Sequence, residues 1–450
     1  MTSQKHFILN GPLKSVMWQI SWPAVLAIVL YGLNNFLDAI LVGHLMNSNA
    51  LAAVGIAYPL SQITLGFGRL IGIGSSASIS MWLGSGQQDK LYRIFGTVNV
   101  LSLLSSVLFS IPAYIFAEQL VHMMGARGEM AILSAEYFRV TLLGSLFWIH
   151  GFSVNMMIRG EGKMRTAAWM IGLGLGIDVL LKPIFISTLG WGVSGAAWAT
   201  NIGMLMYSVL GLWHFSNGKS SFKTKWASFA FDRAIASKIL SLGLPEMIFT
   251  VMAVLQNLVV FNALSRFGSE PDLVFYTVIN RFYLFLLTPL FGLMRGLQPV
   301  AGMNYGAGQL PRARQSLLIF IGTGVLIVLP FWAVTMCFPH QVLSAIMPDM
   351  AITGKLIYNL RIYMSVLPLL PVIVMALSYF PAINEGKKAS MLAISRQAVF
   401  YLPLMFVLPM FFGIESVYWG SAVIDLMMTL ITFFFLWRSF KPAAFQQGIL

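Results

Sequence analysis

The sequence predicts an all-α integral membrane protein with twelve transmembrane helices in two pseudo-symmetric six-helix bundles. Three observations lead to this fold class. Of the 450 residues, 58% are hydrophobic and only 10% are charged, whereas about a quarter of the residues in a soluble domain are charged. Apolar stretches long enough to cross a bilayer core of about 30 Å recur from Trp18 to Trp437. The two halves of the chain also share a residue pattern at constant spacing.

Apolar runs between polar or glycine-rich breaks define the individual spans. The first half is expected to hold spans at residues 14–44, 50–80, 91–117, 130–157, 166–187 and 192–214. The second half is expected to hold spans at residues 235–265, 272–303, 313–336, 352–383, 389–411 and 416–438. Several runs exceed the roughly 20 residues of a minimal span, which indicates tilt or projection beyond the membrane.

The distribution of Lys and Arg predicts how the chain crosses the membrane. With twelve spans and both termini in the cytoplasm, nineteen basic residues fall in inside segments, and only Arg127, Arg266 and Lys355 fall in outside loops. Cytoplasmic segments are enriched in Lys and Arg, so we expect a multi-pass protein of the cytoplasmic (inner) membrane. The net charge of +13 is scattered over short loops and forms no continuous stripe, so no nucleic-acid partner is expected.

The longest polar connection, residues 215–234, lies near the midpoint of the chain. We interpret it as a cytoplasmic linker between an N-terminal lobe (1–214) and a C-terminal lobe (235–450). An offset of 222 residues pairs Pro23 with Pro245, Gly74 with Gly296, Gly84 with Gly306, Gly86 with Gly308, Gln87 with Gln309 and Arg139 with Arg361. Because each half has six spans, both halves start on the same side. The repeats are then parallel and related by an axis along the membrane normal.

Several kinds of site find no support in the sequence. The single cysteine, Cys337, excludes an internal disulfide framework and a multi-cysteine metal site. His44, His150 and His340 form no pair at ligand spacing, so no metal centre is expected. No P-loop pattern for nucleotide hydrolysis occurs, which leaves an ion gradient as the expected energy source. We therefore predict no cofactor beyond a coupling ion, H⁺ or Na⁺.

Short motifs follow one another in a fixed order over nearly the whole chain. In the first half they are Pro23 and residues 34–43 (NNFLDAILVG), 51–55 (LAAVG), 72–74 (GIG), 159–162 (RGEG) and 192–200 (GVSGAAWAT). In the second half they are residues 243–245 (GLP), 295–299 (RGLQP) and 304–308 (NYGAG). Together these motifs resemble those of the multidrug and toxic compound extrusion (MATE) family. The resemblance implies a V-shaped antiporter that expels amphiphilic, often cationic compounds in exchange for inward-moving protons or sodium ions.

The resemblance also implies which residues couple transport to the ion. Asp38 matches the acidic residue that family members use in the first helix. In the fifth helix the family commonly has an Asn and, four residues later, an Asp before Pro, whereas this chain has Asp178 and then Lys182 and Pro183. An acid is therefore displaced by one turn, and a base takes its usual place. Spans 7 and 10 offer only Glu246, near one end, so we place the chain nearer the branch whose coupling site lies in the N-terminal lobe.

Four ionisable side chains are predicted to lie deep in the first half: Asp38, Arg69, Asp178 and Lys182. A charge at the bilayer centre costs about 2.5–3.5 kcal/mol on insertion scales, so these residues need partners or a water-filled cavity. If the first, second and fifth helices meet, two acids and two bases form a neutral network. Protonation of an acid would then free a base to change partners, and Pro183 would let the helix bend beside it. The alternative is a static network that only closes a helix contact.

Further residues are candidates for lining a substrate cavity. Asparagine and arginine would offer polar contacts, whereas methionine and tryptophan adapt to varied shapes and attract organic cations. The candidates are Asn34, Asn155, Met156, Trp169, Asn257, Asn280 and Arg281. The competing interpretation is hydrogen bonding between helices for the polar residues, and contact with lipid or neighbouring helices for Met156 and Trp169.

These features predict a monomeric secondary antiporter, embedded in the lipid bilayer, that exports small amphiphilic and cationic organic molecules by alternating access. H⁺ is favoured over Na⁺ because the carboxylates come with bases, whereas a sodium site prefers uncompensated oxygens. A flippase for lipid-linked precursors is the main alternative. An enzyme is not expected. Residues 192–195 (GVSG) fit a short intramembrane-protease pattern, but they occur at a short outside loop with no suitably placed histidine.

Overall fold

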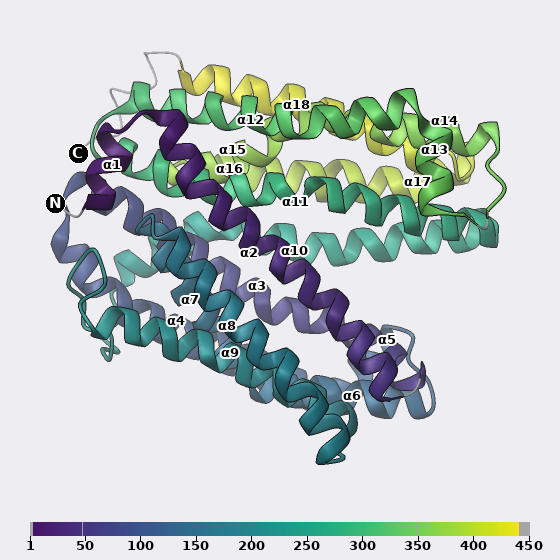
Figure 1. Ribbon diagram of the computed structural model, residues 1–450, viewed down its shortest axis with the longest axis horizontal. Helices are drawn as coiled ribbons and strands as arrows, with labels where there is room; N and C mark the ends of the chain where they lie inside the picture. The colour runs from purple at the N-terminus through teal and green to yellow at the C-terminus, as the bar shows by residue number, and fades with distance from the viewer. Residues whose placement is uncertain (1–2, 47, 349, 441–450) are drawn as a thin grey trace.

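The computed structural model describes residues 3–46, 48–348 and 350–440, and every regular element in these ranges is helical (Figure 1). The first half holds α1 (Ser3–Asn10), α2 (Leu13–Leu45), α3 (Ser48–Ser85), α4 (Gln88–Ile115), α5 (Ala117–Met123), α6 (Glu129–Leu143), α7 (Ser145–Gly160), α8 (Met164–Pro183), η1 (Ile184–Thr188) and α9 (Gly192–Ser216). The second half holds α10 (Arg233–Phe267), α11 (Glu270–Gly306), α12 (Leu310–Cys337), α13 (Pro339–Ile346), α14 (Gly354–Met364), η2 (Leu367–Leu369), α15 (Leu370–Ala382), α16 (Gly386–Ile394), η3 (Ser395–Tyr401), α17 (Leu402–Phe412) and α18 (Ser416–Phe440).

The predicted fold class, an all-α membrane protein, is confirmed. In the described part of the chain, ten segments are long and apolar enough to cross a bilayer, or eleven when α6 and α7, which meet at a bend of 54°, count as one span. The remaining predicted span is α9, which is not among these. Its 25 residues nevertheless reach about 37 Å at 1.5 Å per residue. All predicted span ends lie within five residues of the observed helix ends.

Figure 1 shows two arms that join at one end of the molecule and diverge towards the other, called here the joined end and the open end. We call α2–α9 the N-terminal lobe and α10–α18 the C-terminal lobe. α2 runs diagonally between the arms, because it packs against α11 of the C-terminal lobe and against α8 of the N-terminal lobe. α1 and the end of α18 lie at the joined end.

The lobes meet through glycines that bring two backbones into direct contact. A Cβ added to Gly84 of α3 would lie 2.2 Å from the carbonyl oxygen of Met303 of α11. A Cβ added to Gly306 of α11 would lie 2.0 Å from the carbonyl oxygen of Met81 of α3. The 222-residue offset relates 81 to 303 and 84 to 306. This contact is therefore symmetric under the internal repeat, and small residues are the usual means of such close helix approach in membranes.

Buried serines accompany this contact along α3. Ser75, Ser78 and Ser80 each donate a hydroxyl hydrogen to a carbonyl of the preceding turn, at 2.7, 2.8 and 2.9 Å. Ser76 instead donates to Gln298 of α11 at 3.5 Å. Three of these four hydroxyls are thus satisfied within their own helix.

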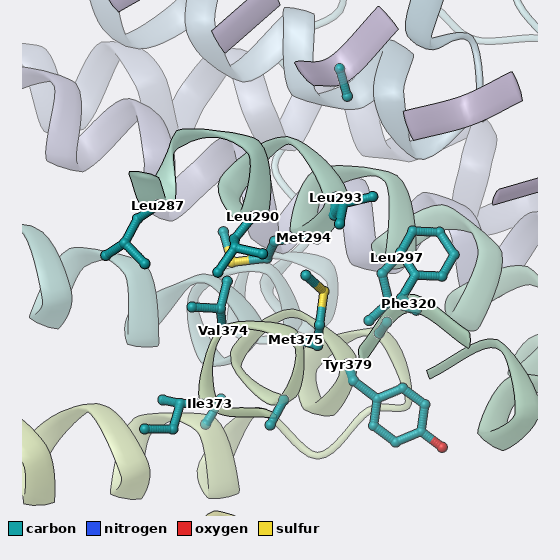
Figure 2. Packing of buried hydrophobic residues seen from close by; sticks show 14 of the residues in the cluster. Leu287, Leu290, Leu293, Met294, Leu297, Phe320, Ile373, Val374, Met375 and Tyr379 are labelled. Atoms are coloured by element: carbon teal, nitrogen blue, oxygen red, sulfur yellow. The ribbon is translucent and has the colours of Figure 1, made fainter. Parts of the chain in front are cut away.

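Apolar side chains fill the space between α11, α12 and α15 in the C-terminal lobe (Figure 2). The side chains labelled there are Leu287, Leu290, Leu293, Met294, Leu297, Phe320, Ile373, Val374, Met375 and Tyr379. In a bilayer the lipid tails are as apolar as these groups, so their packing stabilises the bundle through van der Waals contact more than through the hydrophobic effect. The outer surface is apolar too: Leu108 and Phe411 are 72% and 77% exposed.

The two halves are interrupted at matching places. The fourth predicted span breaks between α6 and α7, and the tenth breaks between α14 and α15. The fifth and eleventh spans each contain a π-helical segment, η1 and η3. Such segments are rare and frequently occur at functional sites. The internal repeat therefore extends to the irregular parts of the helices.

The predicted linker is ordered along the N-terminal lobe. Asn99 of α4 donates to the carbonyls of Trp226 and Ser228, at 3.0 and 2.9 Å. Asp232 caps α10 by accepting hydrogen bonds from the first amides of that helix, and Arg93 lies 3.7 Å from its carboxylate. The division of the chain at residues 215–234 remains a prediction.

We expect Gly84→Ala to destabilise the contact between the lobes, because its methyl group would overlap the backbone of α11. Overpacking of this kind costs about 1–3 kcal/mol. Thermal unfolding in detergent measures the effect as a lower midpoint. Gly322→Ala on α12 is the matched control, since a Cβ there meets nothing within 4 Å. An equal midpoint for the two variants would contradict the close contact.

Candidate functional site

Three of the predicted charged residues meet in the N-terminal lobe. The ammonium of Lys182 donates to Oδ1 of Asp38 at 2.5 Å and to Oδ2 of Asp178 at 2.7 Å. Thr200 of α9 donates to the other oxygen of Asp178, at 3.0 Å. We call Asp38, Asp178 and Lys182 the triad. It joins α2 to α8, and Thr200 joins it to α9.

Local helix geometry explains how the triad forms. Asp178 and Lys182 lie four residues apart on α8 and therefore share a face. α8 approaches α9 closely because a glycine lies on each helix: a Cβ on Gly174 would lie 2.1 Å from the Tyr207 ring, and a Cβ on Gly203 would lie 2.8 Å from the Gly174 carbonyl oxygen. This close approach brings the Thr200 hydroxyl of α9 within hydrogen-bonding distance of the Asp178 carboxylate of α8.

The triad is unbalanced in charge and unequally exposed. Two carboxylates share one ammonium, so the three groups carry one net negative charge when all are ionised. The side chains of Lys182 and Asp178 are each 3% exposed, whereas that of Asp38 is 29% exposed. Asp38 is thus the most exposed member of the triad. One bound proton or one cation would neutralise the set.

The fourth charged residue, Arg69, does not join the triad, which corrects the expected neutral network. Its guanidinium donates to Thr250 of α10 at 3.3 Å, at the contact between the lobes. One turn before Thr250, Glu246 pairs with Arg295 of α11. Arg69 lies on the face of α3 that packs against α10, so its side chain is near this ion pair. The triad therefore keeps its surplus charge, and Arg69 belongs to the interlobe contact.

Pro183 directly follows Lys182 and is the last residue of α8. The π-helical segment Ile184–Thr188 begins immediately after it. Proline has no amide hydrogen, so the regular backbone ladder loses a bond at this point. The change from α to π geometry therefore lies next to the ammonium that both carboxylates share.

The predicted cavity residues divide into several groups. Asn155 is buried, donates to the Ala167 carbonyl at 2.9 Å and accepts from Arg159 at 3.1 Å. Met156 is buried against α3, where a Cβ on Gly72 would lie 3.0 Å from it. Neither faces open space in this conformation, because both fill contacts between helices.

The other candidates lie nearer the surface or outside the described residues. Trp169 is 73% exposed on α8. Asn280 accepts a hydrogen bond from Tyr363 at 3.1 Å, within the C-terminal lobe. Arg281 is exposed on α11. The side chains of Asn34 and Asn257 are outside the part of the chain that the structure describes.

A second charged pair, in the C-terminal lobe, was missed by the sequence analysis. Arg396 of η3 contacts Oδ1 of Asp425 of α18 through two nitrogens, at 2.8 and 3.0 Å. Tyr283 of α11 donates to Oδ2 of the same carboxylate at 3.2 Å. The signal was present, because an acid in the predicted span 416–438 and a base in the span 389–411 are both costly in a membrane.

The two charged sites differ in their balance of positive and negative groups. Arg396 and Asp425 balance each other, whereas the triad has one charge to spare. The sites also occupy unrelated positions in the repeat. With the offset of 224 residues that relates Glu161 to Glu385, Asp425 corresponds to Asn201, which hydrogen-bonds Trp148 and the Val140 carbonyl. Among the described residues, no group of three or more His, Cys, Asp or Glu side chains could hold a metal ion.

Glu161 forms a third buried site, between α7 and α8 at the joined end. Its carboxylate accepts from Lys163 at 2.7 Å and from Ser220 and the Ser221 amide of the linker at 3.1 and 2.6 Å. Burial raises the pKa of Glu161, but the His214 ring and the Lys163 ammonium outweigh burial and hold the pKa below its ordinary value of 4.5. The ionised carboxylate therefore fastens the linker to the N-terminal lobe.

Comparisons with known proteins agree with the repeat and the fold. The MatE family model matches residues 23–184 and 245–407, once in each lobe. The multidrug export protein MepA of Staphylococcus aureus (strain NCTC 8325 / PS 47) is 24% identical over 429 residues, covering 94% of this chain and 93% of MepA. MepA of Staphylococcus haemolyticus (strain JCSC1435) is 24% identical over 435 residues, covering 96% and 95%.

Solved structures show the same architecture. A crystal structure of MATE in the bent conformation has a TM-score of 0.89 at 27% identity, covering 98% of both chains. A MOP superfamily transporter from Pyrococcus furiosus, described as having a binding pocket of reverse polarity, has a TM-score of 0.88 at 26% identity and the same coverage.

We expect Lys182→Met to destabilise the protein far more than Asp38→Asn does. Removing the ammonium leaves Asp178 buried without its counter-charge, which costs about 3–5 kcal/mol. Asp38→Asn leaves the buried pair intact and should cost about 1 kcal/mol or less. Thermal unfolding in detergent compares the variants, and the double variant Asp178→Asn with Lys182→Met should recover part of the loss. Equal midpoints for the two single variants would refute this account of the triad.

We expect Glu161→Gln to lower stability at neutral pH by about 1–3 kcal/mol, because the linker loses its charged acceptor. The folded-state pKa lies below 4.5, so this contribution is present above pH 4.5 and is lost as the pH falls through the folded-state pKa. The difference between wild type and variant should therefore shrink in acid. Unfolding midpoints measured across a pH series test this, and a difference independent of pH would contradict it.

Proposed function

Because this chain belongs to the MatE family, we propose that it is a secondary antiporter that exports amphiphilic organic cations in exchange for protons moving inward. Relatives that align over nearly the whole chain are named multidrug export proteins, which supports small organic molecules as cargo. The surplus negative charge of the triad is the observation that carries the proposal.

The triad supports coupling because a proton and a cationic substrate compete for one charge. With Asp38 ionised, the lobe offers a partly exposed carboxylate to a cation. With Asp38 protonated, the triad is neutral, and Lys182 pairs with the buried Asp178 alone. Occupation by one ligand therefore weakens binding of the other, which is the condition for exchange.

The position of Asp38 links this competition to the arrangement of the lobes. Near the joined end, α2 packs on α11, where a Cβ on Gly292 would lie 2.4 Å from Val25 and a Cβ on Gly296 would lie 2.8 Å from Ser21. Towards the open end, the same helix is tied to α8 through Asp38 and Lys182. Protonation of Asp38 would release the second attachment while keeping the first. We propose that α2 then shifts relative to α8, with the segment after Pro183 absorbing the change.

The composition of the site favours a proton over Na⁺. Sodium needs several oxygen ligands that are not already compensated. Here one ammonium contacts both carboxylates, at 2.5 and 2.7 Å, and the Thr200 hydroxyl takes a further oxygen. A proton needs only one carboxylate oxygen. We further propose that the chain belongs to the branch of the family that couples through the N-terminal lobe, where the triad lies.

The proposed orientation follows from charge. Both termini would lie in the cytoplasm, at the joined end, because the basic residues gather in the connections on that side. The open end then faces outward, as expected for a conformation ready to release cargo. We further propose a monomer in the cytoplasmic membrane.

Transport in proteoliposomes tests the proposal directly. A cationic dye should leave vesicles under a proton gradient and not under a sodium gradient alone, and it should be recovered chemically unchanged. Asp38→Asn should lower the proton-driven rate at least about tenfold, which corresponds to about 1.4 kcal/mol in the rate-limiting step. Glu118→Gln is the matched control, because this carboxylate is 60% exposed and pairs with Arg139 away from the triad.

Two results would overturn the proposal. Full transport by Asp38→Asn would show that the triad does not couple the ion. Transport driven by sodium alone would exclude the proton. A dye that is moved only when it is attached to a lipid would favour the flippase alternative.

A further inference from the structure

An apolar cavity of about 440 Å³ opens at the start of α11, at the open end of the C-terminal lobe. Its walls are Pro271, Val274 and Val278 of α11 and Ile346, Met347, Pro348 and Met350 around the end of α13. No charged or hydrogen-bonding side chain is among these residues. The cavity therefore suits an apolar body, and its two methionines can adapt to bodies of different shape.

Arg281 lies beside this cavity on the same stripe of α11. It is three residues from Val278, so the two side chains are neighbours on one helix face. Arg281 also lies eleven residues before Gly292. Each residue of an α-helix is rotated by about 100° around the axis, so the two residues point in directions that differ by only about 20°. Gly292 faces Val25 of α2. The stripe that packs against the N-terminal lobe at the joined end is thus uncovered at the open end, where it carries Arg281.

Arg281 differs from Arg295 and Arg396, two other arginines within spans of the C-terminal lobe, because the structure gives it no acidic partner among the described residues. Arg295 pairs with Glu246, and Arg396 pairs with Asp425. Arg281 is exposed and forms no ion pair with any side chain that the structure describes. Eleven residues of helix place it about 16 Å from the start of α11. A guanidinium at this depth, next to an apolar cavity, is complementary to an anion attached to an apolar group.

We propose that Arg281 and the adjoining cavity form a substrate subsite that binds the carboxylate and the apolar body of a transported amphiphile. The inference rests on the proposed export function and extends it, because it adds a positive contact in the C-terminal lobe to the negative one in the N-terminal lobe. The guanidinium fork matches a carboxylate in two parallel hydrogen bonds. Amphiphiles that carry both charges would contact both lobes, whereas simple cations would use the triad and the cavity alone.

A pair of dyes with the same apolar body tests the subsite: a free-acid rhodamine and its methyl ester. Both are loaded into proteoliposomes that carry the full chain, and initial efflux rates are measured under a proton gradient. Arg281→Ala should lower efflux of the free acid about tenfold and change efflux of the ester less than about twofold. Arg281→Lys should restore part of the free-acid rate. Val278→Trp, which fills the cavity, should lower efflux of both dyes.

Arg266→Ala is the matched control, because Arg266 is also exposed at the open end, in the last turn of α10. It should leave both dyes unaffected. Equal loss of both dyes in Arg281→Ala would indicate a structural role, and no loss would indicate that Arg281 only contacts lipid headgroups. Either result overturns the subsite. If wild type exports the ester but not the free acid, the subsite is rejected while export stands. If wild type exports neither dye, the proposed export function fails as well.

Discussion

One ammonium shared by two carboxylates is the interaction on which the rest of this molecule depends. Charges inside an apolar bundle are costly unless they are paired, and here two carboxylates contact the same ammonium. Lys182 holds Asp178 in the interior and Asp38 at the surface of the lobe. The glycines of α8 and α9, the Thr200 hydroxyl and the break after Pro183 all serve to place these three groups. The three groups by themselves sum to one negative charge when all are ionised, because two carboxylates contact one ammonium.

The two lobes share a helical architecture but differ in their buried charges. Their spans break at matching places, and their glycines meet symmetrically across the repeat axis. Their charges are not symmetric. The C-terminal pair, Arg396 and Asp425, sums to zero charge and receives a further hydrogen bond from Tyr283. One lobe therefore holds a charge-balanced pair, and the other holds two carboxylates that contact one ammonium.

Much of this arrangement could be predicted from the sequence, because hydropathy fixes the spans and the i, i+4 spacing fixes which face Asp178 and Lys182 share. Asp38 entered through a family resemblance, and geometry then placed it beside Lys182. The placement of Arg69 could not be predicted, because hydropathy does not say how a helix is rotated about its axis. Arg396 lies within the predicted span 389–411, but the sequence did not show that it would meet Asp425 of another helix. At Gly144, between α6 and α7, a Cβ would lie 2.2 Å from the Asn201 side chain, and this contact between distant residues could not be predicted either.

The serines of α3 affect how many hydrogen bonds join the two lobes. A hydroxyl that already donates to its own helix needs no replacement partner when the neighbouring helix withdraws, and no water must enter to solvate it. If the lobes separated, these three hydroxyls would lose no hydrogen bond, whereas the bonds from Ser76 to Gln298 and from Arg69 to Thr250 would break.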